Sequence, residues 1–151
     1  MRPVRAARGG GLHIGLIGTL NHYKGADIAN TLARFIADHG LGTPLTLVGS
    51  SIIPLADTIT PLGPYEIPDL PKLIESHGIT VFFICSIAPE TFCYTLDEIM
   101  AMELPVVSFS LGAQGRRTAA YAHGTTLPPG APIESVYRTL VAAHERAQGG
   151  R

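Results

Sequence analysis

Short apolar runs alternate along the chain with longer segments in which apolar residues recur every three or four positions. The short runs are typical of buried strands, and the longer segments are typical of amphipathic helices. We expect strands at 12–18, 44–48, 58–62, 79–85, 105–109 and 125–127. We expect helices at 26–39, 67–77 with a break at Pro71, 95–102 and 133–146, and one that starts near Arg116 after an SLGAQG loop.

The order of these elements predicts an α/β protein with a doubly wound, Rossmann-like parallel sheet of about six strands and helices on both faces. The run 79–85 (ITVFFIC) has no polar alternation, so it is expected at the centre of the sheet, covered on both sides. Ligands of such sheets bind beyond the carboxyl ends of the strands. The segments 18–25, 49–51, 63–66 and 86–94 should therefore share one edge, which we call the rim.

Composition narrows the functional classes. The 151 residues fit one domain. A composition of 46% hydrophobic and 15% charged residues excludes a disordered chain. Eleven Lys and Arg against twelve Asp and Glu leave a net charge of −1, which gives no sign of a nucleic-acid or anionic-membrane partner. Residues 1–11 are expected to be a disordered lead-in, with the domain at 12–146 and a flexible tail at 147–151.

The cysteines and histidines indicate no metal site. Cys85 and Cys93 lack spaced Cys or His partners, and the six histidines lack metal-ligand spacing. Two free cysteines favour a reducing, cytoplasmic location. The apolar run at 12–18 is too short for a signal peptide or a membrane span.

The loop GTLNHYKG (18–25) leaves the first strand and enters a helix. Helix N-termini attract anions, and Lys24 adds a full positive charge, so this loop favours a phosphate ligand. Its spacing is neither that of the dinucleotide fingerprint nor that of a P-loop. An ordinary glycine-punctuated turn with a solvated lysine is the alternative interpretation.

The segment SIAPETFCYTLDE (86–98) places Glu90 and Glu98 eight residues apart across the turn from the central strand into a helix. Glu98 is expected about two turns into that helix, facing the rim, with Glu90 in the loop before it. Free N–H groups at 92–95 would face an anion, and Glu98 could accept hydrogen bonds from a sugar diol. The alternative is acidic bias at a helix start capped by Thr91 or Thr95.

Taken together, GTLNHYKG, LTLVGSS, TPLGPYE, FFICS, PETFCYTLDE, IMAMELPVV and SLGAQG resemble the carboxyl-terminal domain of group 1 (family 4) retaining glycosyltransferases of the GT-B architecture. The resemblance runs from about Leu12 to Leu140. Its most specific element is the pair of glutamates with seven residues between them, followed by a small-residue helix and Pro-Val-Val.

This resemblance implies a nucleotide-diphosphate sugar as donor and no cofactor or metal. Glu90 would be the catalytic carboxylate near the reacting sugar carbon, Lys24 would bind the diphosphate, and Glu98 would hold the ribose. The other implied donor-site residues are Gly18, Thr19, His22, Gly63, Tyr65, Ser86, Thr91, Phe92, Cys93 and Tyr94. In this assignment the backbone amides near 92–94 bind the distal phosphate, and the segment 63–66 lies against the base.

The sequence departs from the family pattern at three positions. Thr19 stands where the family usually has Arg, and Cys93 and Glu103 stand where it has Gly. Cys93 is expected to crowd the donor pocket. Arg116 or Arg117 could replace the missing cation, or could be an ordinary solvated charge.

Two functions remain open from the sequence. The first is the donor-binding domain of a retaining glycosyltransferase of glycan or polysaccharide biosynthesis. This domain is expected to be inactive alone, because the half that binds a glycan or lipid-linked acceptor is missing. A membrane surface would be contacted only through that missing half. The second is a non-catalytic nucleotide-binding or scaffolding module with a degenerate form of the same fold. Fold alone does not separate them.

Overall fold

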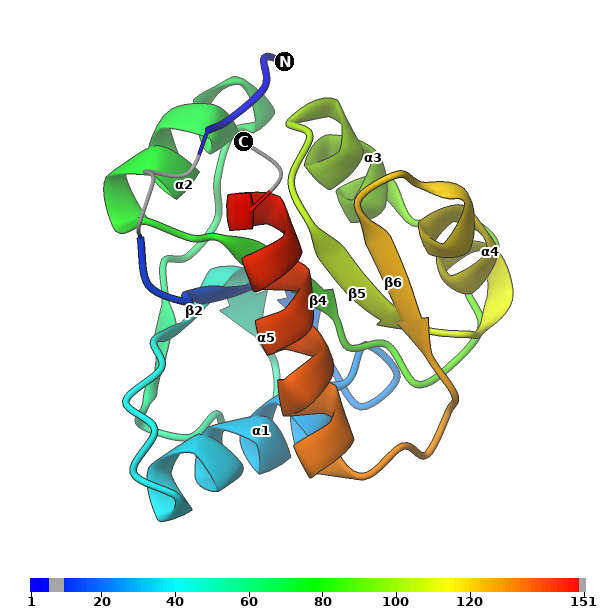
Figure 1. Ribbon diagram of the computed structural model, residues 1–151. Helices are drawn as coiled ribbons and strands as arrows, with labels where there is room; N and C mark the ends of the chain where they lie inside the picture. The colour runs from blue at the N-terminus through cyan, green and yellow to red at the C-terminus, as the bar shows by residue number, and fades with distance from the viewer. Residues whose placement is uncertain (6–9, 150–151) are drawn as a thin grey trace.

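The computed structural model describes residues 1–5 and 10–149, which form a single sheet of six parallel strands and five α-helices (Figure 1). The strand order is β3-β2-β1-β4-β5-β6, as expected for a doubly wound sheet, and β4 is central. The strands are β1 (Ile14–Leu20), β2 (Leu45–Ser51), β3 (Ile59–Pro61), β4 (Val81–Ile84), β5 (Val106–Phe109) and β6 (Gly124–Leu127). The helices are α1 (Ala26–Asp38), α2 (Leu70–His77), α3 (Tyr94–Ala101), α4 (Gly112–Ala120) and α5 (Ile133–Gly149), with a 3₁₀ turn at Ile67–Asp69.

Helices cover both faces of the sheet. Helices α1 and α5 lie side by side over one face, where alternate strand residues such as Leu16 and Phe83 join their apolar stripes. Helices α2 and α3 pack on the other face against residues such as Ile17 and Phe82. Because successive strand residues point to opposite faces, the unbroken apolar run in β4 supplies both cores.

The first two strands run further than predicted. They pair in register from Ile14 with Leu45 to Leu20 with Ser51. Gly18 and Thr19 therefore end a strand instead of opening a loop. A side chain at Gly49 would place its Cβ 2.0 Å from the carbonyl oxygen of Gly18, so the two strands approach this closely only with glycine there.

Two helices differ from the sequence prediction in their limits. The segment at 67–77 begins as a 3₁₀ turn and becomes α2 at Leu70, so Pro71 lies in the first helical turn, where its missing N–H breaks no hydrogen bond. The expected SLGAQG loop is wrong in part, because α4 already begins at Gly112. Its small residues allow the helix to approach neighbouring backbone, which the sequence pattern does not show.

Both chain ends contact the rest of the domain where the structure describes them. Val4 is buried, and its N–H donates to the carbonyl oxygen of Met102 at 2.9 Å. Arg2 forms a two-pronged ion pair with Glu75 at 2.5 and 2.9 Å. Helix α5 continues to Gly149, three residues into the predicted tail; residues 6–9 and 150–151 lie outside the described part.

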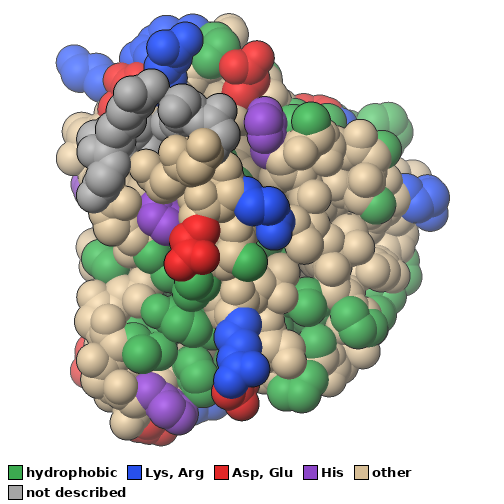
Figure 2. Space-filling model, viewed as in Figure 1, with side chains coloured by type: hydrophobic (Ala, Val, Ile, Leu, Met, Phe, Trp, Pro, Cys, Tyr) green, Lys and Arg blue, Asp and Glu red, His purple; other side chains and the backbone are tan. Residues whose placement is uncertain are grey.

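The surface over α5 carries Lys, Arg, Asp, Glu and His side chains that are scattered rather than gathered into one patch (Figure 2). No helix in the described ranges is both long enough and apolar enough to cross a membrane.

Candidate functional site

The turn from β1 into α1 is built by close packing against the end of β4. Gly25 has φ 88°, and a Cβ there would lie 2.0 Å from the carbonyl oxygen of Cys85, so a left-handed glycine is required. The side-chain oxygen of Asn21 accepts the Lys24 N–H at 2.8 Å, and the Cys85 thiol donates to the Lys24 carbonyl at 3.2 Å. Burial raises the pKa of this thiol to about 12, so Cys85 serves as a neutral donor.

Lys24 forms an ion pair with Glu90, the carboxylate predicted to be catalytic. The Glu90 side chain is only 11% exposed, whereas that of Lys24 is 45% exposed. Ser86, buried at the end of β4, donates its hydroxyl to the second oxygen of Glu90 at 3.3 Å. A nearly buried carboxylate needs such partners, and Lys24 and Ser86 together hold its charge at the rim.

These residues enclose a small cavity of about 70 Å³ between the ends of β1 and β4. Five predicted site residues line it together, and Thr95 of α3 completes the rim side. The five are Gly18, Thr19, Lys24, Ser86 and Glu90.

A second polar pair joins Tyr65, which precedes the 3₁₀ turn, to Glu98 of α3. The Tyr65 hydroxyl donates to one carboxylate oxygen of Glu98 at 2.9 Å. Burial raises the pKa of Glu98, and the hydrogen bond from Tyr65 acts against that rise. Burial, followed by the hydrogen bond to Glu98, raises the pKa of Tyr65 well above its usual value. The other Glu98 oxygen has no protein partner in the described residues and can accept from a ligand hydroxyl.

Helix α3 begins at Tyr94, one residue before the predicted start, but residues 91–93 do not form a helical entry, so Glu98 lies about one turn into the helix rather than two. The residue before the helix is Cys93, and no side chain caps the helix start. The alternative interpretation is therefore wrong about a cap at Thr91 or Thr95, although Asp97 does lie in the first turn. The N–H groups of the first turn remain free to bind an anion.

Several predicted site residues lie away from the cavity. His22 pairs with Asp27 at 2.8 Å, and both side chains are well exposed. The rings of Phe92 and Tyr94 stack on each other at 5.7 Å and are also exposed. Thr91 is exposed, and Gly63, with φ 82°, donates its N–H to the Gly49 carbonyl next to β2.

Cys93 does not crowd the pocket, because its side chain is buried among the apolar residues beneath α2 and α3. Arg117 of α4 pairs with Asp97 of α3 and donates to the Cys93 carbonyl at 3.4 Å. It fixes α4 against α3, so its guanidinium does not replace the missing cation at position 19. Arg116 is exposed and forms no hydrogen bond or ion pair among the described residues.

Sequence reasoning missed one buried residue at the rim. Gln114 on α4 is completely buried and hydrogen-bonded to the backbone at Ala88 and Glu90. Its motif, SLGAQG, entered the family resemblance, but nothing in the motif indicates which segment the glutamine contacts.

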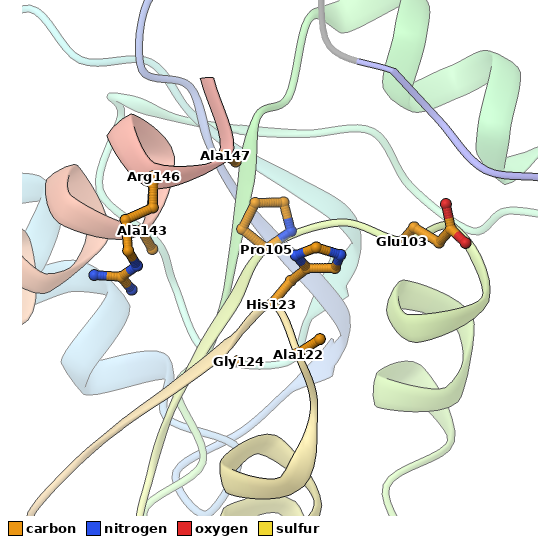
Figure 3. Close-up of a pocket in the computed structure, with 8 residues that line it drawn as sticks. All are labelled: Glu103, Pro105, Ala122, His123, Gly124, Ala143, Arg146 and Ala147. Carbon is orange, nitrogen blue, oxygen red and sulfur yellow. The ribbon is translucent and has the colours of Figure 1, made fainter. Parts of the chain in front are cut away.

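A larger cavity of about 300 Å³ lies at the opposite edge, near the amino ends of β5 and β6. It is lined by Glu103, His123 and Arg146, whose polar groups lie apart instead of converging (Figure 3). Among the described residues, no group of three or more His, Cys, Asp or Glu is placed to hold a metal ion.

No protein-family model matches the sequence, and no curated protein matches it. Solved structures do match. HepE of Anabaena in complex with UDP-glucose superimposes with a TM-score of 0.66 at 20% identity, over 91% of this chain and 43% of HepE. The lipopolysaccharide outer core galactosyltransferase WaaB superimposes with a TM-score of 0.65 at 17% identity, over 97% of this chain and 46% of WaaB.

The C-terminal domain of LpcC, a group 1 family glycosyl transferase from Francisella tularensis, matches with a TM-score of 0.66 at 15% identity. This match covers 91% of the chain and 78% of the LpcC domain. The chain therefore spans less than half of HepE and WaaB but most of an isolated carboxyl-terminal domain. It has the fold of the carboxyl-terminal domain of group 1 GT-B glycosyltransferases.

Proposed function

We propose that this chain binds a nucleoside diphosphate sugar at the rim, as the donor-binding domain of a retaining glycosyltransferase. The observation that carries the proposal is the Lys24–Glu90–Ser86 cluster beside the free first turn of α3. A cation and a helix N-terminus next to each other form an anion site of the kind that phosphates occupy. HepE, which has this fold, was solved with UDP-glucose and with UDP.

The two carboxylates suit different parts of such a donor. Glu98 has one oxygen held by Tyr65 and one available, so it can accept a ribose hydroxyl. Glu90 stands at the cavity next to Lys24, where the first sugar carbon would lie if the lysine contacts the diphosphate. A carboxylate there would stabilise positive charge that develops on the sugar during transfer.

The charge of the site favours the non-catalytic alternative in one respect. Lys24 is already paired with Glu90, and Thr19 supplies no charge. A diphosphate must therefore share the lysine with a carboxylate. Such a site binds nucleotides less tightly than one with two free cations.

Transfer itself belongs to the proposal for the whole enzyme. The chain corresponds to one half of HepE and WaaB in length, and a glycan or lipid-linked acceptor would be held by the other half of the GT-B cleft. Because catalysis needs an acceptor oriented at the sugar carbon, we expect residues 1–151 alone to transfer no sugar.

Calorimetry with UDP-, ADP- and GDP-sugars and the free nucleotides tests the binding function. The proposal requires saturable binding of at least one nucleoside diphosphate sugar, weakened in Lys24→Ala and Glu98→Gln. Glu134→Gln, an exposed carboxylate on α5 paired with Arg138, is the matched control. Absence of binding across the whole panel would refute the proposal.

A further inference from the structure

Gln114 connects α4 to the loop that carries Glu90. Its side-chain oxygen accepts the Glu90 N–H at 3.0 Å, and its side-chain NH₂ donates to the Ala88 carbonyl at 2.9 Å. The residue has no exposed surface, and its own carbonyl accepts from the Ser108 hydroxyl at 3.4 Å. The oxygen and the NH₂ of one buried side-chain amide therefore bind the backbone on the two sides of Pro89.

The start of α4 also binds the backbone of this loop. The Ala113 N–H donates to the Glu90 carbonyl at 2.9 Å, so both backbone polar groups of Glu90 are bound by α4. Gly112 has φ 52°, and a Cβ there would lie 2.6 Å from the Glu90 nitrogen. The loop thus rests directly on a helix start that has no side chain in the way.

The chemistry of this contact requires glutamine. The position needs one acceptor for the Glu90 N–H and one donor for the Ala88 carbonyl, and an amide supplies both. Glutamate would keep the acceptor but face the Ala88 carbonyl without a proton, and methionine would supply neither. A buried donor or acceptor without a partner is costly, so methionine would release the loop at both Ala88 and Glu90, whereas glutamate would release it only at Ala88.

We propose that Gln114 is a positioning residue that fixes the Glu90 carboxylate against Lys24 and the sugar of the donor; this inference rests on the proposed function. Segment 86–93 between β4 and α3 has no helix or strand of its own. Its position therefore depends on contacts with α4 and on the bond from the Ile87 N–H to the Tyr23 carbonyl at 3.0 Å. Loss of the amide frees the part of the loop that bears Glu90 while leaving the diphosphate contacts of Lys24 in place.

Hydrogen exchange tests the contact without any ligand. In Gln114→Met, the Glu90 amide should exchange at least about tenfold faster than in the wild type, because it loses its acceptor. In Gln114→Glu the acceptor remains, so this amide should stay slow. Thr118→Val, an equally buried polar residue on the same helix without a contact to the loop, is the control and should leave the amide unchanged.

Calorimetry tests the functional consequence, with UDP-glucose and UDP as the probes. The affinity for UDP-glucose divided by that for UDP should be lower in Gln114→Met than in the wild type, and equal to the ratio in Glu90→Gln. The double variant should show no further fall in this ratio. UDP affinity in Gln114→Met should not fall below the wild-type value, because Lys24 stays in place and at most loses its competitor Glu90. A merely structural role would weaken both probes equally.

Two results would overturn the inference: an unchanged Glu90 amide in Gln114→Met, or a double variant whose ratio falls well below that of Glu90→Gln. If the wild type binds neither probe, the proposed function loses its support with UDP-glucose. The exchange rates of Gln114→Met and Gln114→Glu then still decide whether Gln114 holds Glu90. The two failures are therefore distinguishable.

Discussion

Replacement of Glu90 by glutamine should strengthen the binding of UDP, although Glu90 lies in the proposed donor site. In the unliganded protein Glu90 forms an ion pair with Lys24, so an incoming diphosphate must compete with Glu90 for that lysine. The lysine side chain is 45% exposed, so solvent screens the pair and its net stabilisation is about 0.2–1 kcal/mol. Removing this competition corresponds to roughly 1.4- to 5-fold tighter UDP binding.

Titration calorimetry of Glu90→Gln with UDP at low ionic strength measures this effect, which should shrink as salt is added. Asp97→Asn is the matched control, because it removes one negative charge from the same region but one that pairs with Arg117. It should not tighten UDP binding to the same extent. Weaker binding of UDP by Glu90→Gln, or equal tightening in the control, would refute the competition for Lys24.

Three further predictions concern stability. Gly25→Ala should destabilise the fold by more than about 2 kcal/mol, since its Cβ would meet the Cys85 carbonyl at 2.0 Å. Gly63→Ala has a similar φ but lies in open space, so it should cost only about 1 kcal/mol. Equal losses of unfolding free energy in urea would contradict this. Glu103 has φ 58°, so Glu103→Gly should raise stability by about 1 kcal/mol and Glu103→Ala should not; equal melting temperatures of the two variants would contradict it. Burial raises the folded-state pKa of Glu98 above its unfolded value. The stability that Glu98 contributes is therefore fully present below the unfolded pKa and is lost as pH rises through the folded pKa. The unfolding free energy of Glu98→Gln, measured in urea at several pH values, should lack this decline, and the same pH dependence in the variant as in the wild type would contradict it.

The fold follows closely from the sequence because its main signal is local. The uninterrupted apolar run in β4 and the period of α1 are each visible in one stretch of chain. The shared location of the candidate residues Gly18, Lys24 and Glu90 also follows from the sequence, since the carboxyl ends of parallel strands must meet at one edge. Their placement at one cavity needed no long-range information.

The details that the sequence did not predict depend on contacts between distant segments. The ion pair of Lys24 with Glu90 joins two loops far apart in the chain, and the hydrogen bond from Tyr65 to Glu98 joins a loop to the distant helix α3. The burial of Val4 likewise depends on the distant residue Met102, whose carbonyl accepts the Val4 N–H. No local pattern indicates such partners.

The central claim is that the rim binds a nucleoside diphosphate through Lys24, and calorimetry of the wild type and Lys24→Ala with UDP and uridine tests it most directly. A charge-assisted bond to the diphosphate is worth about 1.5–3 kcal/mol, so UDP should bind roughly ten- to a hundredfold more weakly to Lys24→Ala. Uridine should bind both proteins alike. Equal losses for UDP and uridine, or UDP binding that Lys24→Ala leaves unchanged, would contradict the account.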